Sequence, residues 1–205
     1  MEEQELGTIA MSKHILIIQG HPDSDDRHLC HSLADAYRHG AREAGFEVDM
    51  IDVATLDFPV LRSGDEWKER DAPRALEDAQ KKILKADHLV IIYPLWLGTM
   101  PALLKAFFEQ TVRPSMVPGD KDSLGHLRSL LTGKSGRIIV TMGMPALAYR
   151  LWFRMHSVKS LQRNILGFVG VGPIFTSLIG LVDNMTPKRA ERLMSQMTLL
   201  GRSAR

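Results

Sequence analysis

The sequence is poor in cysteine, and Cys30 is the only one among 205 residues. A lone cysteine excludes an intrachain disulfide, so we expect a protein of a reducing compartment, the cytoplasm. A strong charge of either sign is also missing, because 26 basic and 24 acidic residues leave a formal net charge of +2. This small excess does not predict a nucleic-acid partner, and the basic residues that gather after residue 150 have the spacing of solvated helix faces.

No apolar run is long enough to cross a bilayer. The longest uncharged stretch, residues 166–182, contains several glycines and Pro173, and it is shorter than the roughly 20 apolar residues that a spanning helix needs. We therefore expect a strand and a loop there and no membrane span. Residues 1–12 lack the basic and apolar regions of a signal peptide. We expect a disordered tail over residues 1–12, with Met11 as a candidate natural start, and a single domain over residues 13–205.

The sequence does contain strand-like apolar runs that alternate with helix-like stretches. The expected strands are residues 14–20, 46–53, 88–93, 137–141 and 167–172. The expected helices are residues 27–44, 73–85, 102–112, 149–165 and 187–200. Strands that alternate with helices predict a parallel sheet with right-handed crossovers. Five such strands predict an α/β, flavodoxin-like three-layer sandwich with the strand order 2-1-3-4-5, in which the carboxyl ends of strands one, three and four meet.

The first of these three strand ends is a polar turn, residues 20–28, Gly-His-Pro-Asp-Ser-Asp-Asp-Arg-His. Such a turn presents backbone N–H groups and a positive helix end to an anion, usually a phosphate. Side chains that can add a donor are His21, Ser24, Arg27 and His28. The alternative is that Asp25 or Asp26 caps the helix. The two interpretations compete, since a carboxylate at the helix start repels a phosphate.

The second strand end is apolar, and it runs from Pro94 to Met100. Trp96 offers a flat apolar wall, and Gly98 allows the backbone to approach a planar ring closely. The alternative is that the large apolar residues of this loop only fill the core.

The third strand end, residues 141–145, again carries a hydroxyl and a glycine. Tyr149 and His156 follow it seven residues apart, which places both on one side of a helix. A phenol and an imidazole together can donate hydrogen bonds to carbonyl oxygens and balance charge during a reduction. The alternative is a buried tyrosine and a surface histidine.

The sequence does not predict a metal site. His28 and His31 share a helix face, but no carboxylate or cysteine cluster completes a set of metal ligands.

Across these three loops the chain resembles the NAD(P)H:quinone oxidoreductase (DT-diaphorase-like) family of flavodoxin-fold flavoproteins. The matching motifs are Gly-His-Pro at residues 20–22, Tyr-Pro-Leu-Trp-Leu-Gly-Thr-Met-Pro-Ala-Leu-Leu-Lys at 93–105, and Thr-Met-Gly at 141–143 with Tyr149 beyond. The likeness runs over residues 14–171, and the second motif is its most specific part.

The resemblance implies an enzyme that uses FAD or FMN, takes hydride from NAD(P)H and passes two electrons to a quinone or a similar acceptor. It places His21 at the flavin phosphate and Tyr149, with the neighbouring His156, at the reacting centre. The flavin ring is expected to contact the following residues: Pro94, Leu95, Trp96, Leu97, Gly98, Thr141, Met142 and Gly143. The family also implies a homodimer with the flavin between the subunits. Trp152 and Phe153, with Met155, could either close the active site or form this dimer interface.

Two features leave alternatives open. The acidic turn at Asp25 and Asp26 departs from the hydroxyl and amide residues that the family favours, which keeps a second interpretation: a non-catalytic module of the same fold, such as an ancillary subunit of a potassium-efflux transporter. Arg150 and Arg154 lie beside the expected site, where they could favour an anionic acceptor or the NADPH 2′-phosphate, or could be surface charge only. Cys30 is expected to be an inert buried thiol.

Overall fold

The computed structural model describes residues 12–69, 71–117 and 124–205. Of the tail expected over residues 1–12, all but Ser12 lies outside the described residues. Five parallel strands form one sheet in the order β2-β1-β3-β4-β5, so the predicted fold and strand order are confirmed. The strands are β1 (His14–Gln19), β2 (Glu47–Asp52), β3 (His88–Pro94), β4 (Ser135–Thr141) and β5 (Ile174–Ile179).

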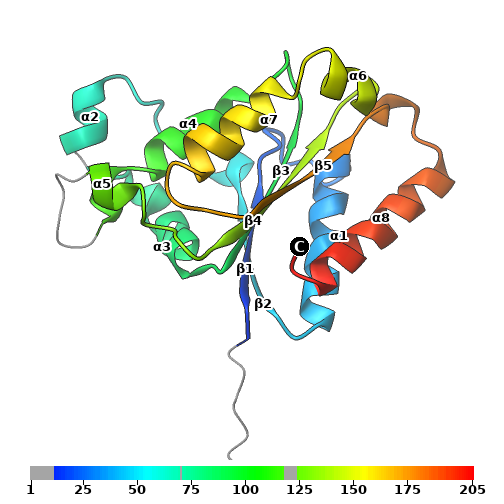
Figure 1. Cartoon of the computed structure of the whole chain (residues 1–205), viewed down its shortest axis with the longest axis horizontal. Coiled ribbons are helices and arrows are strands. Elements are labelled where there is room, and N and C mark those ends of the chain that lie inside the picture. The colour runs from blue at the N-terminus through cyan, green and yellow to red at the C-terminus, as the bar shows by residue number, and fades with distance from the viewer. Residues whose placement is uncertain (1–11, 70, 118–123) are drawn as a thin grey trace, which may run out of the picture.

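Helices cover both faces of the sheet and give the three layers (Figure 1). One face carries α1 (Leu29–Glu43) and α8 (Pro187–Arg202). The other face carries α3 (Glu77–Lys85), α4 (Ala102–Thr111) and α7 (His156–Ser160). Shorter helices are α2 (Gly64–Glu69), α5 (Leu124–Leu127) and α6 (Ala146–Leu151), together with single turns at Val53–Thr55, Arg74–Leu76, Pro114–Met116 and Val182–Asn184.

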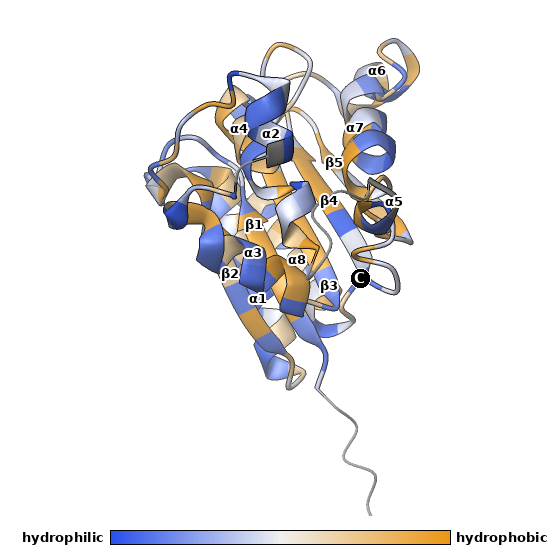
Figure 2. Cartoon of the chain, turned by 90° about the vertical axis from the view of Figure 1, so that its left-hand side faces the viewer, coloured by the Kyte–Doolittle hydropathy of each residue, from blue (hydrophilic) through white to orange (hydrophobic). Residues whose placement is uncertain are grey.

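The central strands are buried on both sides because their residues alternate between two apolar layers. In β1, Ile15 and Ile17 pack under α1 and α8, whereas Leu16 and Ile18 pack under α3 and α4. Figure 2 shows the apolar residues concentrated in the strands, with polar residues along the outer helix surfaces. Continuous apolar runs of this kind are typical of parallel strands that are covered on both faces.

Helices α1 and α8 lie against each other at unusually close range. A Cβ atom on Gly40 would overlap the backbone of Thr198, and one on Gly201 would overlap the carbonyl of Tyr37. Each helix therefore presents a glycine at the point where it touches the backbone of the other. This contact fixes the position of α1, and with it the position of the turn that precedes α1.

Two predictions about the elements are wrong. The fifth strand is Ile174–Ile179 rather than residues 167–172, because Gly170 has a φ of +95° and cannot continue an extended strand. The single helix expected over residues 149–165 is broken: α6 ends at Leu151, α7 begins at His156, and a π-helical segment, Leu161–Leu166, follows. Arg154 and Met155 adopt left-handed φ values of 50° and 56° between the two helices.

Candidate functional site

The loops after β1, β3 and β4 meet at one edge of the sheet, where the strand order reverses. The amide of Leu95, directly after β3, donates to the carbonyl of Thr141 at the end of β4 (2.7 Å). The ring of His21, from the first loop, lies edge-on to the ring of Trp96 with centroids 5.7 Å apart. Residues from all three loops are therefore brought together as predicted, at the place where open α/β sheets bind ligands.

Three histidines form a cluster at the first loop: His21 and His28 in the loop, and His31 in the first turn of α1. The rings of His21 and His28 stack with centroids 4.1 Å apart, and the His31 ring lies 6.0 Å from His21. Asp23 holds them: its backbone contacts Nδ1 of His21 and its carbonyl accepts from His31, while its carboxylate pairs with Nε2 of His28 at 3.0 Å. Burial lowers the pKa of His21, and the neighbouring His28 and His31 lower it further.

The acidic residues of this loop do not cap helix α1. The Asp25 carboxylate accepts hydrogen bonds from the backbone N–H and the guanidinium of Arg27. These bonds, above all those from the Arg27 side chain, lower the pKa of Asp25 to about 2. Helix α1 instead begins after His28, whose side chain makes no capping bond. The first turn of α1 therefore keeps its positive end without a carboxylate cap, as a phosphate site requires.

A buried amide also points to a ligand here. Gln19, the last residue of β1, is fully buried, and its Oε1 accepts from the amide of His21 at 2.9 Å. Its Nε2 has no hydrogen-bond partner within the described ranges. A buried N–H group without a partner costs free energy unless something bonds to it. Gln19 was not among the predicted site residues, although a glutamine that ends an apolar strand was a usable signal.

The second loop is a two-residue hairpin. Trp96 and Thr99 exchange backbone hydrogen bonds of 2.9 and 3.0 Å around Leu97 and Gly98, whose φ values are 46° and 83°. Positive φ at both central residues is the pattern of a type I′ turn, in which Gly98 is favourable and Leu97 is strained. The Trp96 side chain is 49% exposed and Leu97 is fully exposed. The tip of this loop therefore does not fill the core, and its backbone is accessible.

The third loop uses part of its hydrogen-bonding capacity internally. The Thr141 hydroxyl contacts the Cys30 thiol at 3.3 Å, and the Met142 amide donates to the carbonyl of Ile179 at 2.8 Å. Burial raises the pKa of the Cys30 thiol to about 11, which fits an inert thiol. Gly143 is exposed and lies against the carboxylate of Asp183, which a Cβ atom would overlap. Asp183 was not predicted at this site, because residues 182–184 join a different strand to its helix.

Tyr149 and His156 do not share a helix face, so this part of the prediction is wrong. Tyr149 is buried, its hydroxyl lies 2.7 Å from that of Ser157, and its ring stacks with Phe153. His156 is exposed at the start of α7. The left-handed residues between α6 and α7 separate the two side chains. Their assignment as catalytic residues stays a prediction. Of the remaining predicted residues, Pro94 is buried in β3, and Ser24 is exposed.

The described residues fit a flavin at this edge. The uncapped start of α1, the buried Gln19 amide and His21 form a group of donors suited to a phosphate. The hairpin tip at Leu97 and Gly98 offers backbone amides that make no internal hydrogen bond within residues 12–69, 71–117 and 124–205. Among these same residues, no cluster of histidine, cysteine and acidic side chains could hold a metal ion, and no helix is long and apolar enough to span a membrane.

Curated proteins are similar to this chain in sequence. An uncharacterized NAD(P)H oxidoreductase of Haemophilus influenzae is 26% identical over 190 residues, which cover 89% of this chain and 93% of that protein. An FMN-dependent NADH:quinone oxidoreductase of Colwellia psychrerythraea is 32% identical over 57% of this chain. The match spans only 59% of the Colwellia protein, and the same share of an Escherichia coli NAD(P)H oxidoreductase.

Solved structures agree on the fold. The NAD(P)H:quinone oxidoreductase from Methanothermobacter marburgensis superposes with a TM-score of 0.74 at 20% identity, covering 94% of this chain and 96% of that chain. Residues 13–198 match the sequence family described as having a flavodoxin-like fold. The chain therefore belongs to the family of proteins with the flavodoxin-like fold.

Proposed function

We propose that the protein is a flavin-dependent oxidoreductase that carries hydride from NAD(P)H to a quinone or a similar two-electron acceptor. The observation that carries the proposal is the convergence of three strand-end loops, with an uncapped helix start, an unpartnered buried amide and an accessible hairpin tip at one edge. FMN is the flavin that we favour, since the Colwellia relative is FMN-dependent. The names of the relatives that match this chain support the same reaction class.

When bound, the flavin would accept hydride and return two electrons, which is chemistry that no side chain of the chain supplies. The chain's own residues bind and orient. His21, Gln19 and the first amides of α1 would hold the phosphate. The backbone of residues 95–98 and the third loop would fix the ring, with the Trp96 side chain as a wall that excludes water from one side.

The test is uptake of flavin followed by turnover. We expect the purified protein to bind FMN, and the loaded protein to oxidise NADH or NADPH over many turnovers only when a quinone such as menadione is present. A protein that takes up neither FMN nor FAD and is inert with both nucleotides would contradict the enzyme and favour the non-catalytic module.

We also propose a homodimer. Four large apolar side chains of α6 and the residues after it are exposed: Leu147 (64%), Leu151 (67%), Trp152 (84%) and Phe153 (44%). Four exposed large apolar side chains within seven residues indicate an interaction surface. Equilibrium sedimentation is expected to give a dimer for the unmodified protein and a monomer for Trp152→Ser. A monomer at every concentration would contradict the proposal.

We also propose that the protein works in the cytoplasm, since NAD(P)H-dependent reduction is the reaction class proposed above. Cell fractionation tests this.

A further inference from the structure

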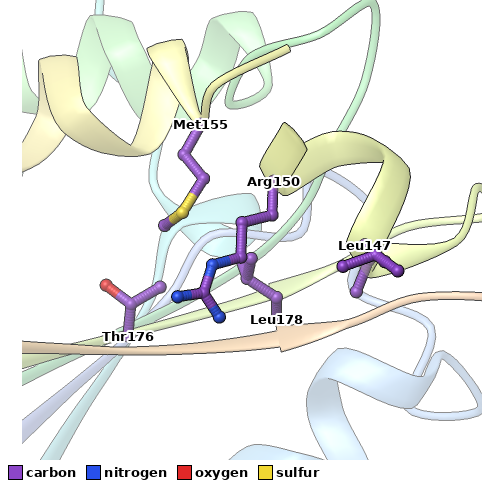
Figure 3. Close-up of a pocket in the computed structure, with 6 residues that line it drawn as sticks. Leu147, Arg150, Met155, Thr176 and Leu178 are labelled. Carbon is purple, nitrogen blue, oxygen red and sulfur yellow. The ribbon is translucent and has the colours of Figure 1, made fainter. Parts of the chain in front are cut away.

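A cavity of about 490 Å³ opens between helix α6 and the edge strand β5. This volume falls in the range of about 300–1,000 Å³ that small-molecule sites occupy. The lining residues are Ala146, Leu147, Arg150, Met155, Thr176 and Leu178. Figure 3 shows the Arg150 side chain reaching from α6 toward β5, on which Thr176 and Leu178 lie.

The lining combines an apolar surface with a single positive charge. Leu147, Met155 and Leu178 are apolar, and among the residues that the structure describes no acidic side chain lines the cavity. Within the described part of the chain, Arg150 makes no ion pair and no hydrogen bond. The Thr176 hydroxyl accepts from the side-chain Nε2 of Gln162 at 2.9 Å, so its own proton remains available for donation. Arg150 and Thr176 together can therefore bind an acidic group.

The cavity adjoins the proposed redox site. One of its lining residues, Ala146, directly follows the third loop. Gly180, directly after β5, packs closely on the same loop, because a Cβ atom on Gly180 would lie 2.6 Å from the carbonyl oxygen of Met144. The third loop is tied to the second by the bond from Leu95 to Thr141. The cavity therefore lies next in the fold to the third loop, which is expected to hold the flavin ring.

We propose that this cavity is a subsite for the acidic group of the electron acceptor, so that the protein prefers acceptors with a flat apolar body and a carboxylate or sulfonate. This inference rests on the proposed function. The apolar walls favour such a molecule over the 2′-phosphate of NADPH, which is anionic but has no apolar part to fill the space beside Leu147 and Leu178. Quinone, NAD(P)H and a proton yield hydroquinone and NAD(P)⁺, so the acidic group itself is not altered.

The first experiment needs no flavin. Binding of 2-naphthoate and of its neutral isostere 2-naphthamide to the flavin-free protein is measured by calorimetry, with 2′-AMP as a phosphate probe. We expect the preference for naphthoate over naphthamide to fall about tenfold in Arg150→Gln, the size of a lost charge-assisted hydrogen bond at a partly exposed site. Arg192→Gln removes the same charge from α8, on the other face of the sheet, and is expected to keep the preference.

An unchanged preference in Arg150→Gln would overturn the subsite, as would Arg150-dependent binding of 2′-AMP in the absence of naphthoate binding.

The second experiment uses the FMN-loaded protein and compares kcat/KM for 1,4-naphthoquinone-2-sulfonate with that for 1,4-naphthoquinone. The sulfonate-to-neutral ratio is expected to fall about tenfold in Arg150→Gln and to hold in Arg192→Gln. If Arg150→Gln loses naphthoate binding but keeps the sulfonate-to-neutral ratio, the cavity binds acids but is not the acceptor subsite, and only the acceptor role is overturned. Absence of any quinone reduction would overturn it together with the proposed function.

Discussion

At the scale of single residues, the structure answers the question that the acidic first loop raised. Asp25 is neutralised by Arg27, and Asp23 organises the histidines, so neither carboxylate occupies the start of α1. The sequence alone could not decide this, because the choice between a cap and an ion pair depends on the path of a nine-residue turn. The sequence predicts His21 as a phosphate contact, and the structure adds the buried Gln19 beside it as a further candidate.

We expect the His21 ring to make the affinity for FMN depend on pH. Burial holds its pKa below the ordinary value of 6.5, so the ring is neutral at neutral pH. A phosphate beside it favours the charged ring, so binding takes up a proton and the affinity should rise as the pH falls from about 8 to about 6. Fluorescence titrations at several pH values test this. In His21→Asn only the protonation of the phosphate itself remains, which removes negative charge and weakens binding as the pH falls. This variant should therefore lose the rise in affinity, and equal slopes in the two proteins would contradict the role of His21.

Variants of Tyr149 and Ser157, whose buried hydroxyls lie 2.7 Å apart, can distinguish a structural from a catalytic role of Tyr149. Removing either hydroxyl breaks the 2.7 Å bond between them and leaves the Tyr149 hydroxyl, in Ser157→Ala, with only the longer 3.4 Å bond from the backbone amide of Val158. The lost bond should cost about 1–3 kcal/mol in the free energy of unfolding. Denaturant unfolding should therefore show a similar loss for Tyr149→Phe and Ser157→Ala, and the double variant should lose less than the sum. If Tyr149→Phe slows quinone reduction while Ser157→Ala does not, the tyrosine is catalytic, as the resemblance implies.

At the scale of elements, long apolar runs were predictable and interrupted ones were not. The strands at residues 14–19 and 88–94 follow directly from continuous apolar sequence. The segment from 149 to 165 has a helical period, but the left-handed Arg154 and Met155 break it, and no glycine or proline marks the break. The fifth strand was placed too early because residues 167–172 are as uncharged as the true strand that follows.

The hairpin of the second loop supplies a matched pair of variants. Gly98 and Gly133 both have φ near +85° with open space where a Cβ atom would lie (φ of +83° and +87°). Alanine at either position should cost a similar amount, about 1–2 kcal/mol of backbone strain. Only Gly98→Ala should also weaken FMN binding, because Gly133 lies at the opposite end of β4. Thermal unfolding and flavin titration of both variants measure this, and equal affinities would remove the hairpin from the site.

The contact between α1 and α8 predicts a strong effect of one methyl group. Alanine is favoured over glycine by about 1 kcal/mol inside a helix, but at Gly40 the added carbon overlaps the backbone of Thr198. Overpacking costs about 1–3 kcal/mol or more, so Gly40→Ala should lower the free energy of unfolding. Gly64→Ala, in α2 with open space around it, is the control and should be neutral or stabilising. A stabilised Gly40→Ala would show that the helices separate at little cost.

At the scale of the whole molecule, the sheet order accounts for the site. Three loops that are far apart in sequence meet because β1, β3 and β4 are neighbours in the order 2-1-3-4-5. This arrangement could be predicted from the alternation of strands and helices. The cavity at Arg150 could not, since it depends on the break between α6 and α7 and on the true position of β5.

The most direct test of the central claim is anaerobic reduction of the FMN-loaded protein. NADH or NADPH should bleach the visible absorbance of the bound flavin, and one equivalent of a quinone should restore it with formation of hydroquinone. Bound flavin that neither nucleotide reduces, or reduced flavin that a quinone does not reoxidise, would contradict the account.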